Sequence, residues 1–270
     1  MLRLTAAGRQ RAIAKRITEQ QGVRISSIAE DYGVSPETIR RDLLLLEKEG
    51  AIQRVYGGAI VADRGAPIQE RIKFQSEGKA AIAKIVAKLV KPNQRVFISG
   101  GSSNLAIAHA LRDAAPLFVT TNMPAIAEAL QGPAEHRVFL TGGEYIHSSG
   151  VLNGSQTLAS ISDCVFDLSI IGAYGIDLKF GLVESSRENQ QLKQSLIERS
   201  HSSIFVADST KFGASGAFCS APLSKAGTIV TDQMPSAEFA DAFDRFGVRV
   251  IYPNKPGRRA FEVSDLEEEP

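Results

Sequence analysis

The sequence predicts an α/β protein with two domains of unequal size. A small N-terminal helical domain ends in a β-hairpin, and a larger domain contains a doubly wound, mostly parallel sheet. In the first 61 residues, three amphipathic helix patterns are separated by turn residues and followed by a Gly-Gly turn. Beyond residue 75, short and almost continuously apolar strands alternate with helix patterns, which is typical of a parallel sheet covered on both faces. A chain of 270 residues is long enough to bury two cores.

Charge is divided unevenly along the chain. Residues 1–75 carry 13 Lys and Arg against 9 Asp and Glu, whereas the remainder carries 18 against 21. A basic N-terminal segment followed by a mildly acidic remainder is compatible with binding a polyanion through the N-terminal segment only. No apolar run approaches the length of about 20 residues that crosses a bilayer, and the N-terminus has no signal-peptide core. We therefore expect a cytoplasmic protein that makes no membrane contact.

Cysteine and histidine spacing gives no sign of a metal site or a disulfide framework. Cys164 and Cys219 lie far apart and form no CxxC motif, which favours a reducing compartment. The four histidines show no ligand spacing such as HxxxH. We expect neither a metal nor a cofactor. The expected boundaries are 1–61 for the small domain, 62–75 for a polar linker containing Gly65 and Pro67, 76–252 for the large domain and 253–270 for a charged, disordered tail.

The first two helices of the small domain follow from short apolar stripes. The first is expected over residues 5–20 and ends before Gly22, and the second is expected to be capped by Ser26 or Ser27. The residues that turn inward are Ile13 and Ile17 in the first helix and Ile28, Ala29 and Tyr32 in the second. A tight Gly-Val-Ser connector then leads into a third helix.

The third helix and the hairpin complete a winged helix-turn-helix. Ser35 caps this helix and Pro36 takes its first position, where the missing N–H costs nothing. The helix runs to about residue 49, and its apolar stripe consists of Ile39, Leu43 and Leu46. A strand at 51–55 and a returning strand at 59–61 enclose a Tyr-Gly-Gly turn.

The N-terminal end of the third helix carries the residues expected to contact DNA. A recognition helix enters the major groove N-terminus first, and the residues at that end are Ser35, Pro36, Glu37 and Thr38. Arg40 and Arg41 follow one turn later, where guanidinium groups can bind guanine edges or phosphates. The hairpin of residues 51–61 is the wing of this motif, and it is expected to place Arg54, Tyr56 and Gly57 beside the DNA backbone. Alternatively, Arg40 and Arg41 lie on a solvated helix face, as most Arg pairs do.

These motifs resemble the DeoR family of bacterial regulators. The matching residues are Ile28-Ala29, Val34-Ser35, the run from Thr38 to Leu43, Leu46-Glu47, Gly50, Arg54 and Tyr56-Gly57-Gly58-Ala59. The resemblance implies that the small domain binds double-stranded operator DNA. The resemblance also covers residues from about 75 to 235, which resemble the C-terminal domain of the family. That domain is similar in fold to ribose-5-phosphate isomerase.

The large domain is expected to alternate strands with helices after a first helix that starts at Glu77 and ends before Pro92. The expected strands are 95–99, 117–120, 137–140, 165–171, 203–207, 228–230 and 248–251. The expected helices are 105–112, 125–130 and 189–200.

A Gly/Ser loop after the first strand has the composition of an anion site. Glycines let the backbone approach a ligand, and the following helix N-terminus offers free N–H groups and a positive dipole. The residues are Gly100, Gly101, Ser102, Ser103 and Asn104. The alternative is an ordinary Gly/Ser helix cap. The family usually has an acidic residue followed by Gly-Thr-Thr here, whereas this chain has Ser99 and then Gly-Ser-Ser, so a carboxylate contact with sugar hydroxyls is lost.

Further polar residues follow other strands, at the edge where open α/β sheets bind ligands. They are Thr121, Asn122, Gly142, Gly143, Gly175, Asp177, Asp208 and Lys211. Asp177 and Asp208 would accept from sugar hydroxyls, and Lys211, with Lys193 as a weaker candidate, would attract phosphate. Other roles stay open, because Asp177 can cap a turn, Lys193 can be solvated, and Asp208 and Lys211 can form a loop ion pair.

The predicted function is a repressor of a sugar-metabolism operon that a phosphorylated sugar releases from its operator. A homo-oligomer, dimer or tetramer, is expected from operator geometry and from the resemblance. One alternative is a sugar-phosphate isomerase with a DNA-binding head, for which Asp177, Glu184 and Lys211 are the candidate groups. The other is an activator, because repression is implied by the resemblance alone.

Overall fold

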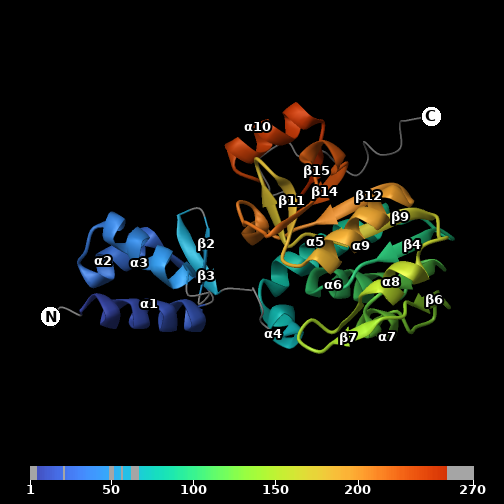
Figure 1. The fold of residues 1–270 in the computed structure, drawn as a ribbon, viewed down its shortest axis with the longest axis horizontal. Helices are drawn as coiled ribbons and strands as arrows, with labels where there is room; N and C mark the ends of the chain where they lie inside the picture. Colours follow the sequence, from blue (N-terminus) through green and yellow to red (C-terminus); the bar gives the residue numbers. More distant parts are fainter. Residues whose placement is uncertain (1–4, 21, 49–51, 56, 62–66, 254–270) are drawn as a thin grey trace. The chain divides into compact units, whose positions relative to one another are not determined.

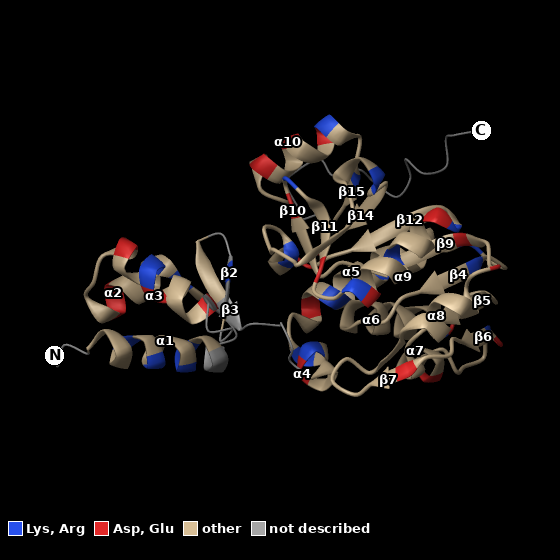
Figure 2. Cartoon of the chain, in the orientation of Figure 1, with Lys and Arg blue, Asp and Glu red and all other residues tan. Residues whose placement is uncertain are grey.

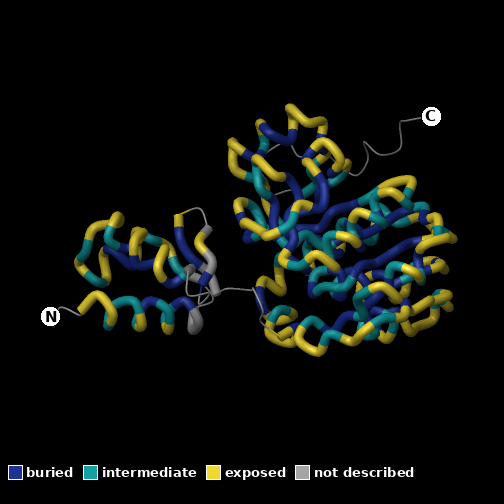
Figure 3. The backbone as a smooth tube through the Cα atoms, in the orientation of Figure 1, coloured by how far each residue is buried: buried dark blue, intermediate teal, exposed yellow. Residues whose placement is uncertain are grey.

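The computed structural model describes residues 5–20, 22–48, 52–55, 57–61 and 67–253. It divides into two compact units, Met1–Phe74 and Gln75–Pro270, and each is described by itself (Figure 1). Both units are built around buried apolar cores, as Figure 3 shows for their central helices and strands. The charged tail expected from residue 253 onward lies outside the described residues except for Pro253.

The first unit is a winged helix-turn-helix, as expected. Its elements are α1 (Ala6–Gln20), β1 (Gly22–Arg24), α2 (Ile25–Tyr32), α3 (Pro36–Lys48), β2 (Ile52–Val55), β3 (Gly58–Val61) and α4 (Ile68–Lys73). The three strands form an antiparallel sheet in the order β1-β3-β2. The predicted stripe residues Ile13, Ile17, Ile28, Ile39 and Leu43 are all fully buried and pack in one core.

One local expectation in this unit was wrong. Helix α2 begins at Ile25 without a side-chain cap, so neither Ser26 nor Ser27 caps it. Strand β1 leads directly into the helix, and the backbone N–H of Ile25 donates to the carbonyl of Gly57 at 2.9 Å, which replaces a cap. Within the predicted linker at 62–75, the structure has helix α4, whose N-cap residue is Pro67. Residues 62–66 lie outside the described residues.

The second unit contains a seven-stranded sheet that is parallel throughout. Its strands are β4 (Arg95–Ile98), β5 (Phe118–Thr121), β6 (Arg137–Leu140), β9 (Phe166–Gly172), β12 (Ser200–Val206), β14 (Thr228–Val230) and β15 (Arg249–Ile251). Their order in the sheet is β15-β14-β12-β9-β4-β5-β6. The chain builds outward from β4 to β6 on one side and then from β9 to β15 on the other. The topological switch point therefore lies between β4 and β9.

Helices lie on both faces of this sheet, as the doubly wound prediction requires (Figure 1). They are α5 (Ser76–Leu89), α6 (Ser102–Leu111), α7 (Pro124–Ala129), α8 (Ser155–Ser160), α9 (Arg187–Glu198) and α10 (Ala237–Phe246), with short 3-10 helices η1 (Ser209–Lys211) and η2 (Leu223–Lys225). The core between sheet and helices is mainly aliphatic and includes several phenylalanines, of which Phe97 and Phe166 are in edge contact at a centroid distance of 5.4 Å. Among the described residues, no helix is long and apolar enough to cross a membrane.

Two small antiparallel sheets were not predicted. One contains β10 (Gly175–Asp177), β11 (Gly181–Glu184) and β13 (Phe218–Ala221), and the other pairs β7 (Glu144–Ile146) with β8 (Val151–Asn153). Their strands are only three or four residues long, so they are too short to show an alternating pattern. Both sheets extend the loops at the carboxyl edge of the main sheet and so help to shape the region of the expected ligand site.

An ion pair at the opposite, amino-terminal edge of the sheet predicts a limited acid sensitivity. The Arg95 guanidinium donates to Asp167, with Nη2 2.5 Å from Oδ1, and this hydrogen bond lowers the pKa of Asp167 from 3.8 to about 2. Because the folded state favours the charged carboxylate, the stabilisation is complete above about pH 4 and is lost as pH falls towards 2. Asp167→Asn is expected to flatten the pH dependence of the urea midpoint between pH 4 and 2.5. An unchanged slope would contradict this assignment.

Candidate functional site

The N-terminal end of α3 is exposed and held in shape by its own cap. The Ser35 hydroxyl accepts from the backbone N–H of Thr38 at 3.2 Å and contacts the Thr38 hydroxyl at 2.9 Å. Pro36, Glu37, Arg40 and Arg41 are exposed, and Thr38 is half-buried. Arg40 Nη1 lies 3.0 Å from Glu37 Oε2, an exposed pair that DNA can replace at little cost. The residues expected to contact DNA therefore share one accessible helix end.

Asp42 fixes α3 against α1, a role that the sequence analysis did not assign. Its carboxylate is 3% exposed and accepts from Arg9 Nε at 2.6 Å, from Arg9 Nη2 at 3.3 Å and from Gln10 Nε2 at 2.9 Å. A signal for this was present, because Asp42 lies three residues after Ile39, in register with the buried stripe. A carboxylate at such a position requires a partner.

The three wing residues that are expected to contact DNA differ in what the structure shows of them. Arg54 is exposed, and its guanidinium Nε donates to Glu47 Oε2 at 2.9 Å, which ties β2 to α3. Gly57 is exposed with a φ of 77°, a conformation that favours glycine. Tyr56 lies outside the described residues. Figure 2 shows Lys and Arg along α1 and α3 of this unit.

The Gly/Ser loop begins α6 at the topological switch point, where open α/β sheets bind ligands. Gly101 is the N-cap with a φ of 146°, and no side chain caps this helix start. The backbone N–H of Gly100 donates to Asn122 Oδ1 at 2.8 Å. Ser103 is half-buried, whereas Ser102 is 6% exposed. The loop thus presents backbone N–H groups and a helix dipole, which suit an anion.

Ser99 and Asn104 support the Gly/Ser loop through buried hydrogen bonds. Asn104 is fully buried, and its amide Nδ2 donates to the Ser99 carbonyl at 2.6 Å and to the Ser99 hydroxyl at 2.9 Å. The Ser99 hydroxyl also accepts from the backbone N–H of Gly172 at 3.2 Å, which joins β4 to β9. Asn104 Oδ1 is buried without a hydrogen-bond partner among the described residues. Ser99 therefore supports the loop.

Thr121, Asn122, Gly142 and Gly143 have supporting positions around the loop. Thr121 and Asn122 are buried, and Asn122 Nδ2 donates to the carbonyl of Leu152 on β8 at 3.0 Å. Gly142 accepts from the Thr157 hydroxyl at 2.7 Å. A Cβ on Gly143 would lie 2.2 Å from the Thr157 hydroxyl, so close packing requires glycine there. Of these residues, Asn122 contacts the loop directly, through the hydrogen bond that its Oδ1 accepts from the Gly100 N–H.

Gly175 and Asp177 lie in the small β10-β11-β13 sheet. The Asp177 carboxylate accepts from the backbone N–H groups of Lys179 and Phe180, each at 2.8 Å, so it caps the β10–β11 turn. Of the two roles left open for Asp177, the structure has the turn cap. A Cβ on Gly175 would lie 2.5 Å from the carbonyl of Ala214, which explains glycine by packing.

Asp208 is the N-cap of η1 and Lys211 is its last residue, and this short helix follows the carboxyl end of β12. Asp208 is 1% exposed, and its Oδ1 accepts from the backbone N–H of Thr210 at 3.1 Å and from the Thr210 hydroxyl. Its other oxygen is buried without a hydrogen-bond partner among the described residues. Lys211 is half-buried and close enough to Glu184 to favour the charged form of that carboxyl.

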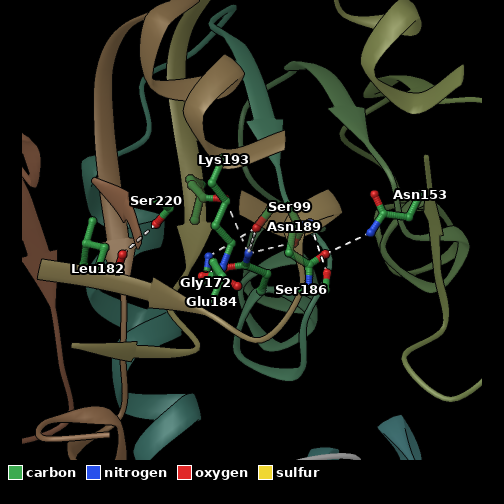
Figure 4. A network of polar contacts seen from close by, with 11 residues as sticks. Ser99, Asn153, Gly172, Leu182, Glu184, Ser186, Asn189, Lys193 and Ser220 are labelled. Atoms are coloured by element: carbon green, nitrogen blue, oxygen red, sulfur yellow. Dashed lines mark hydrogen bonds and ion pairs between the residues drawn. The ribbon is translucent and has the colours of Figure 1, made fainter. Parts of the chain in front are cut away.

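Glu184 and Lys193 form a buried ion pair that was not predicted. The side chain of Glu184 is 2% exposed and that of Lys193 is 11% exposed. Lys193 Nζ donates to Glu184 Oε1 and, at 2.5 Å, to the carbonyl of Gly172 (Figure 4). Burial raises the pKa of the Glu184 carboxyl, an effect that the Lys193 ammonium opposes. Of the two roles considered for Lys193, the solvated helix residue is wrong, and the attraction of phosphate stays a prediction.

A metal centre finds no support in the part of the chain that the structure describes. No group of three or more His, Cys, Asp or Glu side chains there could hold an ion. Cys164 and Cys219 are both free thiols.

Two family models match the two units of the chain. The DeoR-like helix-turn-helix domain matches residues 9–65, and the DeoR C terminal sensor domain matches residues 74–233. The chain belongs to the DeoR family. It is a DNA-binding transcriptional regulator, and its larger domain is a sensor domain.

Curated relatives of this DeoR-family regulator are similar over most of their length. The putative aga operon transcriptional repressor of Escherichia coli O157:H7 is 29% identical, over 90% of this chain and 92% of the relative. The glycerol-3-phosphate regulon repressor of Escherichia coli K12 is 32% identical, over 84% and 91%. The transcriptional repressor GlcR of Bacillus subtilis 168 is 31% identical, over 81% and 85%.

Among solved structures, ribose 5-phosphate isomerase A from Methanocaldococcus jannaschii matches with a TM-score of 0.37 at 12% identity, over 51% of this chain and 54% of that one.

Proposed function

We propose that this DeoR-family regulator is a repressor of sugar metabolism that holds double-stranded operator DNA and is released by a phosphorylated sugar. The relatives support repression and a sugar or sugar-phosphate context, since they include repressors of an aga operon and of a glycerol-3-phosphate regulon. The observation that carries the effector assignment is the uncapped start of α6 at the switch point of a parallel sheet. It offers N–H groups where a phosphate would bind.

Operator binding is assigned to α3 and the wing. Ser35, Pro36, Glu37, Thr38, Arg40 and Arg41 form the accessible end of the recognition helix, and Arg54, Tyr56 and Gly57 would contact the DNA backbone. In a homo-oligomer, two such helices would read half-sites about 34 Å apart, one duplex turn. A ligand that binds better to another arrangement of the sensor domains shifts the population and releases the operator.

Thermal denaturation against phosphorylated sugars tests the effector assignment. The ligands are glycerol 3-phosphate, ribose 5-phosphate and glucose 6-phosphate, each beside its unphosphorylated parent. A ligand at 100 times its dissociation constant stabilises the folded protein by about 2.7 kcal/mol, which raises Tm visibly. We expect a rise with a phosphorylated compound and none with its parent, together with release of operator DNA in a mobility-shift assay. Equal effects of ester and parent would refute the anion site.

Arg40→Ala tests the DNA-contact assignment. If Arg40 reads a base, the substitution is expected to weaken operator binding by about 1–3 kcal/mol and to relax specificity at one position. Lys225→Ala, an exposed change in the sensor domain, is the matched control and should leave affinity unchanged. Fluorescence anisotropy with labelled operator measures both. An Arg40→Ala protein with wild-type affinity would remove Arg40 from the contact set.

We infer that the sensor domain binds its ligand without converting it. Isomerisation needs a carboxylate base next to the substrate, and of the three candidate groups Asp177 is engaged in a turn. Incubation with ribose 5-phosphate, followed by chromatographic separation of ketose and aldose, is expected to give no product above background. Measurable turnover would contradict this inference.

A further inference from the structure

The buried ion pair of Glu184 and Lys193 lies directly beside the proposed phosphate loop. Glu184 ends β11, and Lys193 lies on α9, so two elements outside the main sheet supply the pair. A single residue, Gly172, connects it to the loop. The Gly172 N–H donates to the Ser99 hydroxyl at 3.2 Å, and its carbonyl accepts from Lys193 Nζ at 2.5 Å. Figure 4 shows the Lys193 side chain extending to Gly172 and Glu184 next to Ser99.

Gly172 lies between the two groups. A Cβ at this position would lie 3.6 Å from Asn104 Nδ2 and 4.0 Å from the carbonyl oxygen of Gly100, both ordinary contact distances, so Gly172 lies directly against the start of the loop. To reach Lys193, a ligand whose phosphate bound at the start of α6 would have to extend its carbon skeleton past Gly172. The two groups would contact different parts of one molecule.

The chemistry of the pair suits a neutral oxygen better than a phosphate. An ammonium group has three N–H donors, and two of those of Lys193 go to Glu184 and Gly172. The third donor has no hydrogen-bond partner among the residues that the structure describes, and it can bind a ligand. The Glu184 carboxylate offsets the positive charge, so a dianion gains little attraction here and meets repulsion from the carboxylate. A hydroxyl or carbonyl oxygen can accept the third hydrogen bond without that repulsion.

We propose that Lys193 is a specificity-determining residue of the sensor, binding a hydroxyl or carbonyl oxygen of the ligand's carbon skeleton, and that Glu184 positions Lys193 and offsets its charge. The proposal rests on the assignment of a phosphorylated ligand to the α6 loop. It keeps the ligand class of the proposed function, a phosphate ester of a sugar or polyol, and names the residue that recognises the carbon skeleton. The loop supplies affinity for the phosphate, and Lys193 selects the skeleton.

Isothermal titration calorimetry on the full chain tests this with a graded set of ligands. Inorganic phosphate and ethyl phosphate carry no skeleton hydroxyls, whereas glycerol 3-phosphate, ribose 5-phosphate and glucose 6-phosphate do. For the wild type we expect the tightest hydroxylated ester to bind about tenfold or more tightly than ethyl phosphate, the effect of one hydrogen bond to a charged group. No preference for any hydroxylated ester would overturn the proposal.

The double variant Lys193→Met/Glu184→Gln removes both charges, so no buried charge is left unpaired. We expect it to bind ethyl phosphate as the wild type does and to lose the preference for the hydroxylated ester. Lys91→Gln, an exposed change before β4, is the control and should keep the preference. A double variant that retains the preference would show that the pair is structural only.

Glu184→Gln alone provides a readout that a structural role would not move. Lys193 then carries an uncompensated charge, so binding of inorganic phosphate is expected to strengthen while the preference for hydroxylated esters falls. Equal weakening towards all ligands would overturn the proposed role of Glu184. If no phosphorylated compound binds the wild type, the proposed effector loop and this inference both fail. If ethyl phosphate binds and the preference is absent, only this inference fails.

Discussion

Asp42→Ala is expected to unfold the DNA-binding domain at growth temperature while the sensor domain stays folded. The substitution leaves Arg9 and Gln10 without their shared acceptor in a mostly buried position. Breaking a buried ion pair by removing one partner costs about 3–5 kcal/mol, which is most of the stability of a domain of this size. Differential scanning calorimetry should show the transition of the small domain shifted down by ten degrees or more, on the order of the usual relation between stability and Tm. Operator binding should be lost in parallel.

Asp31→Ala is the matched control for this experiment. Asp31 also pairs with an arginine of α1, since Arg16 Nη1 lies 2.5 Å from Asp31 Oδ2, but the Asp31 side chain is 46% exposed. Exposed pairs contribute under about 1 kcal/mol, so little change is expected. Equal destabilisation by the two substitutions would contradict the special role of Asp42.

Ser102→Glu is expected to abolish the response to the effector and leave operator binding intact. The carboxylate would occupy the N–H groups at the start of α6, where the proposed phosphate binds, and would repel a second anion. Operator release should fail even at ligand concentrations that saturate the wild type, and the ligand-induced rise in Tm should disappear. Both are measured on one preparation by mobility shift and thermal denaturation.

Two further substitutions make this result interpretable. Ser102 is 6% exposed, so the larger side chain also strains the packing, whereas Ser103 is half-buried and Ser103→Glu tests the same charge with less strain. Ser236→Glu adds the same charge at the N-cap of α10 and should respond normally. The placement of the phosphate would be refuted by two results together. Ser103→Glu would respond fully to the effector, and Ser102→Glu would fold and also respond.

The sequence predicted those parts of the fold that depend on local patterns. Ser35 and Pro36 mark the start of α3, and the apolar runs at 95–99 and 165–171 correspond to β4 and β9. Helix α10 was missed although Phe239, Ala242 and Phe243 are spaced as a buried helix face. Strand β1 was missed because three residues carry no periodic signal, and it forms only by pairing with β3.

The candidate site was predictable as a set of residues at strand ends but not as a geometry. From its position in the sequence, Asp177 could be a ligand contact or a turn cap, and the cap becomes visible only in the β10–β11 hairpin. Lys193 was considered alone because its partner Glu184 lies on a strand that no pattern predicted. The link from Ser99 to Gly172 joins residues 73 positions apart, and it follows from strand order rather than from either local sequence.

During synthesis, the ligand site is completed well after the DNA-binding domain. Strand β9 can insert beside β4 only once Gly172 has been made, and Lys193 follows later still. At about 5–20 residues per second, the ribosome needs roughly 8 to 30 seconds between the end of β3 and Lys211. A chain cut short within this interval would keep the DNA-contacting residues of α3 and the hairpin and lack the site proposed to bind the ligand. Truncation within the sensor domain is therefore expected to remove the response to the ligand, together with the sensor arrangement on which paired operator binding is proposed to depend.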